Sequence, residues 1–472
     1  MRILSLGVGG RLDRAALRPL GALPREAMEA AERIVDDVRE RGDVAVREHS
    51  LRLDGSCPEE FRVPGEVIEG ALDLVDEEFL SALRLAARQI RDFHERERER
   101  SWFTTRADGT VLGVQVTPVA SAALYVPGGR AQYPSTVLMD SIPAKVAGVQ
   151  RVIMMTPPQR DGSLSAYTLA AAAVAGVDEL YAVGGAQAIA AAAYGTESIP
   201  PVEKIVGPGN AFVAAAKRCV SGDVGIDMVA GPSEVCVLAD ATADPVVVAA
   251  DLMAQAEHDP MAACYLVTPD ARLPQKVEDA IELLVPQSPR KDITRASLDV
   301  HGVIVITSSL ADAVDAVNVI APEHLELHCA DSLSLVGKVR NAGAIFVGAW
   351  SSEPLGDYVA GPNHTLPTGG TARFSSPLGV YDFTKRSSVI SYSPEGLLAD
   401  GPAVQALAQA EGLWAHALSI GLRRRLLAEG RASTGFSDVA SACEDAGFTA
   451  WPRALRAPGT ARLSDPGDQA GD

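Results

Sequence analysis

The dipeptide Glu323-His324 places a carboxylate and an imidazole side by side in the chain. A carboxylate can activate a water molecule and an imidazole can accept protons near neutral pH, so the pair is suited to acid–base catalysis. The pair also has an explanation without catalysis, with Glu323 as an acid in the first turn of a helix and His324 as a partly buried, hydrogen-bonded histidine. The other histidines of the chain bear on this choice.

Several polar side chains elsewhere in the sequence could bind a metal ion. Gln255 and His258 are three residues apart at the end of a predicted helix, so one face could offer an amide oxygen and an imidazole to the same ion. A histidine that hydrogen-bonds the last helix carbonyls explains these residues without a metal. Asp357 and His364 lie in a segment rich in glycine and proline, where a loop can hold polar groups over a cleft, although Asp357 alone could be a turn residue. His416 is predicted to lie on a helix, where a surface or core histidine is the alternative. The sequence lacks the H-E-x-x-H motif and paired cysteines, so a metal site would have to be assembled from distant segments.

Two turns that contain glycine could bind the phosphate groups of a dinucleotide. Residues 183–187 read VGGAQ and residues 206–210 read VGPGN, and each stretch joins a predicted strand to a predicted helix. Backbone N–H groups and the helix dipole favour anionic phosphates at such positions. Turns of this kind use glycine in any case, so one alone is weak evidence, whereas two in neighbouring units indicate a pocket.

Alternating strands and helices carry these residues and predict parallel sheets with helices on both faces. The expected strands are residues 110–117, 121–126, 151–156, 179–183, 204–206, 234–239, 264–268, 303–307 and 343–348. The expected helices are residues 25–41, 76–100, 163–175, 186–193, 244–257, 273–284, 310–320 and 403–427, with two more that begin near Pro134 and Asn210. Residues 350–385 should form a long, largely irregular segment, which in a compact protein is typical of a functional loop.

Composition excludes several classes of protein. The net charge of −19, from 42 basic and 61 acidic residues, argues against a nucleic-acid or anionic-membrane partner. The six cysteines lie far apart and form no C-x-x-C pair, as expected for reduced thiols in a cytoplasmic protein. No apolar run approaches the roughly 20 residues that cross a bilayer, and the first residues lack the apolar core of a signal peptide. Cys264 has apolar neighbours, so we expect a buried, unreactive thiol.

Taken together, the motifs resemble those of the histidinol dehydrogenase family, and the likeness covers roughly residues 10–428 in order. The matching stretches are YVPGG (125–129), YPSTVLM (133–139), VGGAQAI (183–189), VGPGN (206–210), AGPSEV (230–235), QAEHDP (255–260), APEHLE (321–326), GDYVAGPNHTLP (356–367) and EGLWAH (411–416). The motif positions show no departure from the family. The tail beyond about residue 430 extends past the usual end.

The resemblance implies a zinc- and NAD-dependent enzyme that oxidises L-histidinol to L-histidinal and then to L-histidine, reducing two NAD. His324 would be the general base of both oxidations, and Glu323 would activate the water that hydrates the aldehyde. One Zn²⁺ per chain would be held by Gln255, His258, Asp357 and His416. These four side chains, Glu323 and His324 would also contact the substrate, together with Ser233, His364 and Glu411. The NAD contacts implied by the resemblance are Tyr125, Gln187 and Asn210.

The resemblance also implies a homodimer in which the C-terminal region reaches the neighbour's active site, so that His416 and Glu411 could act in trans. The expected architecture is two doubly wound, Rossmann-like domains with a short N-terminal arm and a helical C-terminal region. The expected divisions are an arm at 1–24, a zinc domain at 25–124 and 234–376, an NAD domain at 125–233, a helical dimerisation region at 377–430, and a mobile tail at 431–472 that turnover should not require.

Two other functions fit parts of the pattern. A relative that oxidises another small polar alcohol would keep the metal and the Glu-His pair but change the substrate contacts, whereas His364 and Glu411 match the histidinol pattern. If this were a regulatory protein that only binds a metal ion or a nucleotide, nothing would explain why the Glu323-His324 pair accompanies the candidate metal ligands and the candidate nucleotide pocket.

Overall fold

A computed structural model describes residues 1–17, 23–128 and 132–431 of the chain. Within them, contacts divide the chain into a larger unit, Met1–Glu99 with Thr117–Lys385, and a smaller one, Arg100–Val116 with the chain from Arg386 onward. Nearly all of the expected tail lies outside the described residues. None of the helices in the described ranges is long and apolar enough to cross a membrane.

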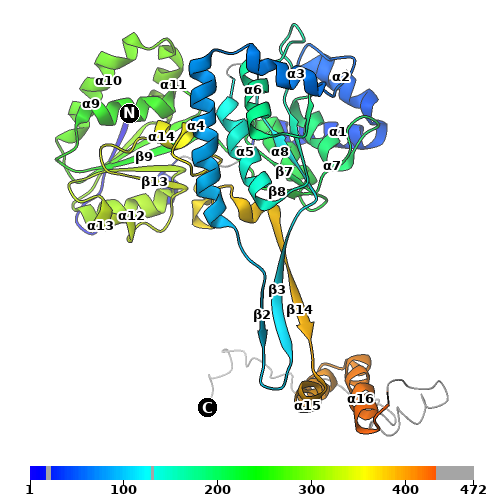
Figure 1. Ribbon diagram of the computed structural model, residues 1–472. Helices are drawn as coiled ribbons and strands as arrows, with labels where there is room; N and C mark the ends of the chain where they lie inside the picture. The colour runs from blue at the N-terminus through cyan, green and yellow to red at the C-terminus, as the bar shows by residue number, and fades with distance from the viewer. Residues whose placement is uncertain (18–22, 129–131, 432–472) are drawn as a thin grey trace, which may run out of the picture. The chain divides into compact units, whose positions relative to one another are not determined.

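A parallel six-stranded sheet forms one half of the larger unit (Figure 1). Its strands, in spatial order, are β1 (Arg2–Ser5), β11 (Val303–Ile306), β10 (Ala263–Thr268), β9 (Glu234–Ala239), β12 (His324–His328) and β13 (Ala344–Val347). One face packs on α9 (Pro245–Ala256), α10 (Leu273–Leu284) and α11 (Lys291–His301), and the other on α12 (Leu310–Ile320) and α13 (Leu333–Val336). Helix α14 (Glu353–Tyr358) follows the edge strand β13.

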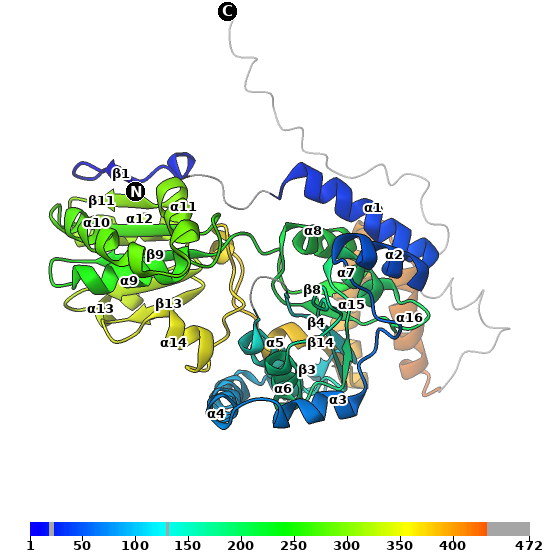
Figure 2. The same ribbon diagram turned by 90° about the horizontal axis from the view of Figure 1, so that it is seen from above.

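A parallel five-stranded sheet forms the other half. Its strands, in spatial order, are β6 (Glu179–Tyr181), β5 (Arg151–Met155), β4 (Ser121–Tyr125), β7 (Lys204–Val206) and β8 (Gly225–Ile226). One core contains α5 (Pro134–Ala147) and α6 (Ala166–Ala175) with α3 (Gly65–Gly70) and α4 (Glu77–His94). The core on the other side contains α7 (Gly185–Tyr194) and α8 (Ala211–Val220) with α1 (Arg25–Arg41) and α2 (Asp43–Leu53), which lie side by side in Figure 2.

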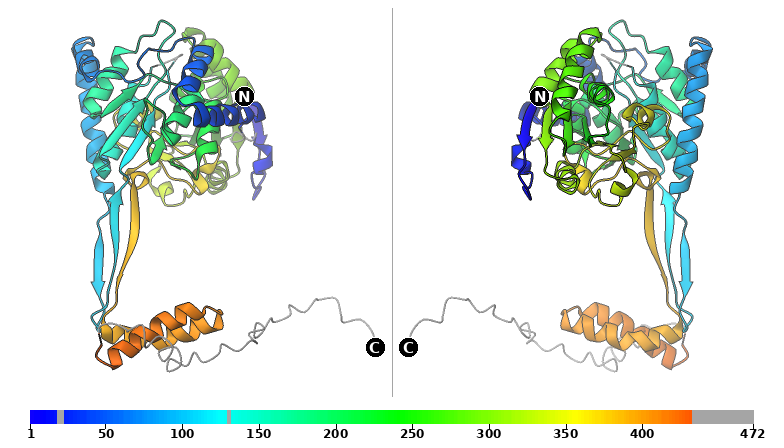
Figure 3. Two further views of the ribbon diagram at one scale, coloured as in Figure 1. Left: turned by 90° about the vertical axis from the view of Figure 1, so that its right-hand side faces the viewer. Right: turned by 90° about the vertical axis from the view of Figure 1, so that its left-hand side faces the viewer.

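The third sheet has the strand order β14 (Thr384–Ser391), β3 (Val111–Pro118) and β2 (Trp102–Thr105), with β2 and β3 antiparallel. Helices α15 (Pro394–Ala410) and α16 (Trp414–Ala428) of the smaller unit pack together through Ala408 and Ala417 (Figure 3).

The structure confirms the two doubly wound α/β blocks and the helical C-terminal region, and it differs in detail elsewhere. The expected arm contributes strand β1, because Arg2–Ser5 pairs in parallel with β11. The expected helix at 403–427 is two helices, since Gly412 adopts a left-handed conformation with φ of +76° between them. The segment expected to be irregular contains the short helix α14. Glu323 does not begin a helix but directly precedes β12, which corrects the first-turn interpretation.

The packing of the N-terminal helices also differs from the expected division of the chain. Residues 25–124 were grouped with the six-stranded sheet, but the apolar faces of α1 and α4 are buried in the two cores of the five-stranded sheet. Burial of those apolar stripes, and not sequence order, decides which sheet a helix covers.

Candidate active site

The adjacent amino ends of β9 and β12 bring Glu323 and His324 to one buried place. His324 is in register with Val235, so Glu323, the residue before β12, lies beside Glu234, the first residue of β9. Glu323 Oε2 accepts a hydrogen bond of 2.8 Å from the Glu234 backbone N–H, and His324 Nδ1 lies 3.2 Å from the Glu234 carbonyl oxygen, to which it can donate. These contacts fix both side chains and leave the Nε2 atom of His324 facing helix α14.

Carboxylates surround the imidazole of His324. Its Nε2 atom lies 3.6 Å from Asp357 Oδ1, and its Nδ1 atom lies 3.7 Å from Glu323 Oε2. Burial alone would lower the pKa of His324, but Glu353, Glu323 and Asp357 together raise that pKa well above its ordinary value. Burial raises the pKa of Glu323 to about 7, with His324 opposing the change. Glu323 can therefore exchange protons near neutral pH, and the surrounding carboxylates stabilise the protonated form of His324.

Three donors suited to a metal ion converge beside this pair. Donor atoms of His258, Glu353 and Asp357 all lie within 4.8 Å of one another. Gln255 lies on α9 and is 1% exposed, and its Oε1 atom has no hydrogen-bond partner among the described residues. The Oε2 atom of Glu353 is likewise buried without one. A set of nitrogen and oxygen donors with orphaned buried oxygens fits zinc.

His364 and Ser233 lie close to the same cluster. His364 Nδ1 lies 3.0 Å from the Asp357 carbonyl oxygen, and its Nε2 atom lies 3.2 Å from Thr136 Oγ1 on α5. Ser233 directly precedes β9 and is half-buried, beside Glu234. A cavity of about 530 Å³ is lined by His324, Asp357 and His364 together with apolar residues of β13 and α14. The size of the cavity and the few polar side chains in its mostly apolar wall suit a small substrate that carries polar groups.

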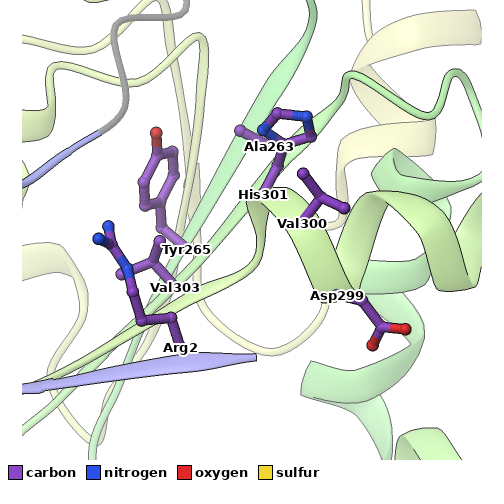
Figure 4. Close-up of a pocket in the computed structure, with 7 residues that line it drawn as sticks. All are labelled: Arg2, Ala263, Tyr265, Asp299, Val300, His301 and Val303. Atoms are coloured by element: carbon purple, nitrogen blue, oxygen red, sulfur yellow. The ribbon is translucent and has the colours of Figure 1, made fainter.

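A second cavity, of about 220 Å³, lies at the amino ends of β10 and β11 (Figure 4). It is lined by Arg2, Ala263, Tyr265, Asp299, Val300, His301 and Val303. None of the side chains predicted to be functional lines it, so it is separate from the candidate site.

The three residues predicted to contact NAD lie at the carboxyl edge of the five-stranded sheet. The strand order reverses at β4, and ligands bind at such switch points in doubly wound sheets. Tyr125 Oη accepts a hydrogen bond of 3.1 Å from Gly185 N, and Asn210 caps the first turn of α8. Gln187 is fully buried, and its Nε2 atom donates to Asp54 Oδ2 at 3.0 Å.

Packing accounts for two glycines of these turns without a nucleotide. A Cβ atom on Gly184 would lie 2.3 Å from Pro157 Cβ. Gly207 has a φ of +108°, and a Cβ atom there would lie 2.4 Å from the Tyr125 carbonyl oxygen. Both turns therefore need glycine to pack, and the location at the switch point is the better indication of a cofactor.

Two predicted site residues belong to the smaller unit. Glu411 ends α15 as its C-cap, and His416 lies in the first turn of α16. The structure therefore groups Gln255, His258, Asp357, Glu323 and His324 in the larger unit and places Glu411 and His416 on the other.

Sequence reasoning missed Glu234 and Glu353. Burial, reinforced by Glu323, raises the pKa of Glu234 to about 8, and burial raises that of Glu353 to about 8 as well. Glu353 precedes Asp357 by four residues, a spacing that would have placed both on one helix face if α14 had been expected. Cys264 is fully buried, and burial raises the pKa of its thiol, as expected for an unreactive side chain.

Comparisons with known proteins agree with the motifs. The sequence profile of the histidinol dehydrogenases matches residues 22–424. A histidinol dehydrogenase of Geobacillus kaustophilus is 54% identical over 390 residues, which cover 83% of this chain and 92% of the relative. One of Bacillus subtilis is 48% identical over 429 residues, which cover 91% of this chain and 100% of the relative. The crystal structure of the histidinol dehydrogenase from Elizabethkingia anophelis aligns with a TM-score of 0.84 at 33% identity, covering 90% of this chain and 98% of that one.

Proposed function

The chain belongs to the histidinol dehydrogenase family of oxidoreductases in histidine biosynthesis, and from this premise we propose how its residues divide the reaction. The substrate is L-histidinol, which is oxidised through L-histidinal to L-histidine. The observation that supports the proposal is His324 at the wall of a cavity, with Glu323 beside it and the donor cluster of His258, Glu353 and Asp357 close by.

In the first oxidation His324 accepts the hydroxyl proton of the alcohol as the carbinol carbon loses a hydride. The Glu234 carbonyl holds Nδ1 of the imidazole, so Nε2 is the atom that receives the proton. The carboxylates near His324 stabilise the imidazolium that forms.

Glu323 acts between the two oxidations. A water molecule adds to the aldehyde carbon, and Glu323 takes a proton from that water. The raised pKa of Glu323, about 7, makes it a stronger base than an exposed glutamate. In the second oxidation His324 accepts a proton from a hydroxyl group of the hydrated aldehyde as its carbon loses a second hydride, and the carboxylic acid forms.

Zinc would be held by Gln255, His258 and Asp357, with His416 completing the set. When bound, zinc supplies a Lewis acid that orients the substrate's imidazole and amine, and NAD supplies the hydride acceptor. Tyr125, Gln187 and Asn210 contact NAD at the switch point of the five-stranded sheet. Ser233, His364 and Glu411 contact the substrate.

We also propose a homodimer in which Glu411 and His416 serve the partner's site, and a cytoplasmic location. Large apolar side chains exposed on the smaller unit, such as Trp102 and Leu407, support the dimer. The five described cysteines are free, which suits a reducing compartment.

The decisive experiment mixes zinc-loaded protein with limiting L-histidinol and excess NAD and follows NADH absorbance to completion. We expect two NADH per histidinol, activity lost on chelation and activity restored by zinc. One NADH per histidinol would contradict the role of Glu323 in hydration. Zinc-loaded protein that forms no NADH would indicate a different alcohol as substrate.

A further inference from the structure

A second group of buried charges, Asp251, Glu326 and His328, lies outside the candidate active site. The three residues are 7%, 0% and 4% exposed. His328 Nε2 lies 3.4 Å from Asp251 Oδ2 and 3.4 Å from Glu326 Oε2, so the imidazole bridges the two carboxylates. The proposed reaction uses none of the three.

The group joins the elements that carry the active site. Glu326 and His328 alternate with leucines along β12 and therefore share the sheet face of His324. Asp251 lies on α9, one helical turn before Gln255. Glu326 Oε1 also accepts a hydrogen bond of 2.7 Å from the backbone N–H of Glu353, the first residue of α14. Through these contacts one group touches β12, α9 and the start of α14.

The contacts of Asp251 and Glu353 each constrain a proposed zinc ligand that lies one helical turn further along the same helix. A shift of Asp251 along α9 moves Gln255 with it, and a shift of Glu353 moves Asp357, because residues i and i+4 lie on one helix face. Buried charges add little to stability compared with apolar residues of similar size, so the presence of these three needs another explanation. Outer partners of metal-binding side chains typically change metal affinity by about 10–100-fold when removed.

We propose that Asp251, Glu326 and His328 are positioning residues that hold α9 and α14 against β12 and thereby align Gln255 and Asp357 for zinc. This inference rests on the proposed zinc site of the family enzyme. The group acts through the donors and does not touch the substrate.

Two variants of Glu326 separate positioning from mere occupancy of the core. Glu326→Gln keeps an oxygen that can accept from Glu353 N–H, whereas Glu326→Leu fills a similar volume and removes it. Zinc dissociation constants are measured on full-length holoenzyme by competition with a chromophoric chelator, and kcat and KM for histidinol are measured at saturating zinc. We expect zinc affinity about 10–100-fold weaker for the leucine variant and within a few-fold of wild type for the glutamine variant. We also expect the leucine variant to have a raised KM for histidinol at saturating zinc.

Leu327→Ala is the matched control, because Leu327 lies on the same strand but packs into the core of the opposite face. It should lower the thermal midpoint and leave zinc affinity unchanged. Weaker zinc binding by Leu327→Ala, equal to that of Glu326→Leu, would overturn the proposal, as would wild-type affinity in Glu326→Leu.

The donor atoms of this group also lie within 4.8 Å of one another, so a metal ion is the competing interpretation. Two zinc ions per wild-type chain, reduced to one in His328→Leu, would overturn the positioning role. Wild-type protein that binds zinc but does not oxidise histidinol would contradict the proposed function alone, and the affinity ratio of the Glu326 variants would still decide this inference. Wild-type protein that binds no zinc would contradict both.

Discussion

At the scale of single residues, burial sets the protonation of the groups that matter. Glu323, Glu234 and Glu353 are all almost fully buried, and burial raises the pKa of each. Glu323 and Glu234 each accept a hydrogen bond from a backbone N–H, but Glu323 also lies 3.7 Å from the His324 imidazole. That closeness to His324 distinguishes a base that activates water from a neighbouring buried acid.

Replacing Glu323 by glutamine should separate the two oxidations. Glutamine keeps an oxygen that can accept from the Glu234 N–H but cannot take a proton from water, so hydration of the aldehyde should slow by about 10²–10⁴-fold. Alcohol oxidation, followed as the first NADH formed in a single turnover, should be much less affected. His324→Asn is the contrasting variant and should slow both steps. Equal slowing of both steps in Glu323→Gln would contradict the assignment.

Asp54, next to Gln187, gives a test of pH dependence. Burial raises the pKa of Asp54 from 3.8 to about 6, and the hydrogen bond from Gln187 offsets only part of this. The folded state therefore binds the proton more tightly than the unfolded state, and stability falls as the pH rises from about 4 through 6. Asp54→Asn should raise the free energy of unfolding at pH 8 by on the order of 1 kcal/mol, after discounting for solvent screening, and change it little at pH 4.

Urea unfolding at both pH values measures this effect, with Asp73→Asn, an exposed position, as the control. An equal increase at pH 4 and pH 8 would show that the charge of Asp54 is not responsible.

At the scale of elements, patterns along the chain predicted most strands and helices, because buried parallel strands and amphipathic helices leave strong local signals. Strand β12 was not expected from its pattern. His324, Glu326 and His328 suggest a face turned to solvent, yet all five residues of the strand are buried. The polar face of β12 is buried because it carries both His324 of the candidate site and the buried charges Glu326 and His328. The meeting of His258 with Asp357 depends on packing between α9 and α14, which local sequence does not encode.

The turn after β7 depends on another buried charge pair. Lys217 on α8 is 2% exposed, pairs with Asp227, and donates a hydrogen bond of 2.8 Å to the Gly207 carbonyl oxygen. The Gly207 N–H in turn donates to Asp227 Oδ2 at 2.9 Å. Lys217→Met would leave a buried carboxylate without its cation and should cost about 3–5 kcal/mol in the free energy of unfolding.

The double variant Lys217→Met with Asp227→Asn removes that lone charge and keeps an acceptor for Gly207, so it should recover much of the loss. Urea midpoints measure both variants. A double variant as unstable as Lys217→Met alone would show that lost packing, not the isolated charge, is responsible.

At the scale of the whole molecule, the smaller unit has little core of its own. The buried apolar cluster described in its helices consists of Ala408 and Ala417, whereas Phe103, Ile390 and Leu407 are more than half exposed. Exposed apolar surface of this kind is typical of an interface between subunits. Sequence motifs placed Glu411 and His416 in the site only through family resemblance, since neither shares a unit with the other donors.

The proposed dimer therefore predicts that zinc and activity are lost together when subunits separate. Leu407→Glu places a charge on the exposed apolar surface of α15 and should shift the protein toward monomer, lowering zinc content and turnover in parallel. Leu333→Glu, at an exposed position of the larger unit, is the matched control and should change neither. Light scattering, bound zinc and NADH formation are measured on the same dilution series. Below its dimer dissociation constant, wild-type protein should also become monomeric and lose zinc and turnover in parallel. Activity that stays constant per chain while the protein becomes monomeric would mean that each chain completes its own site, and that His416 binds zinc within its own subunit or not at all.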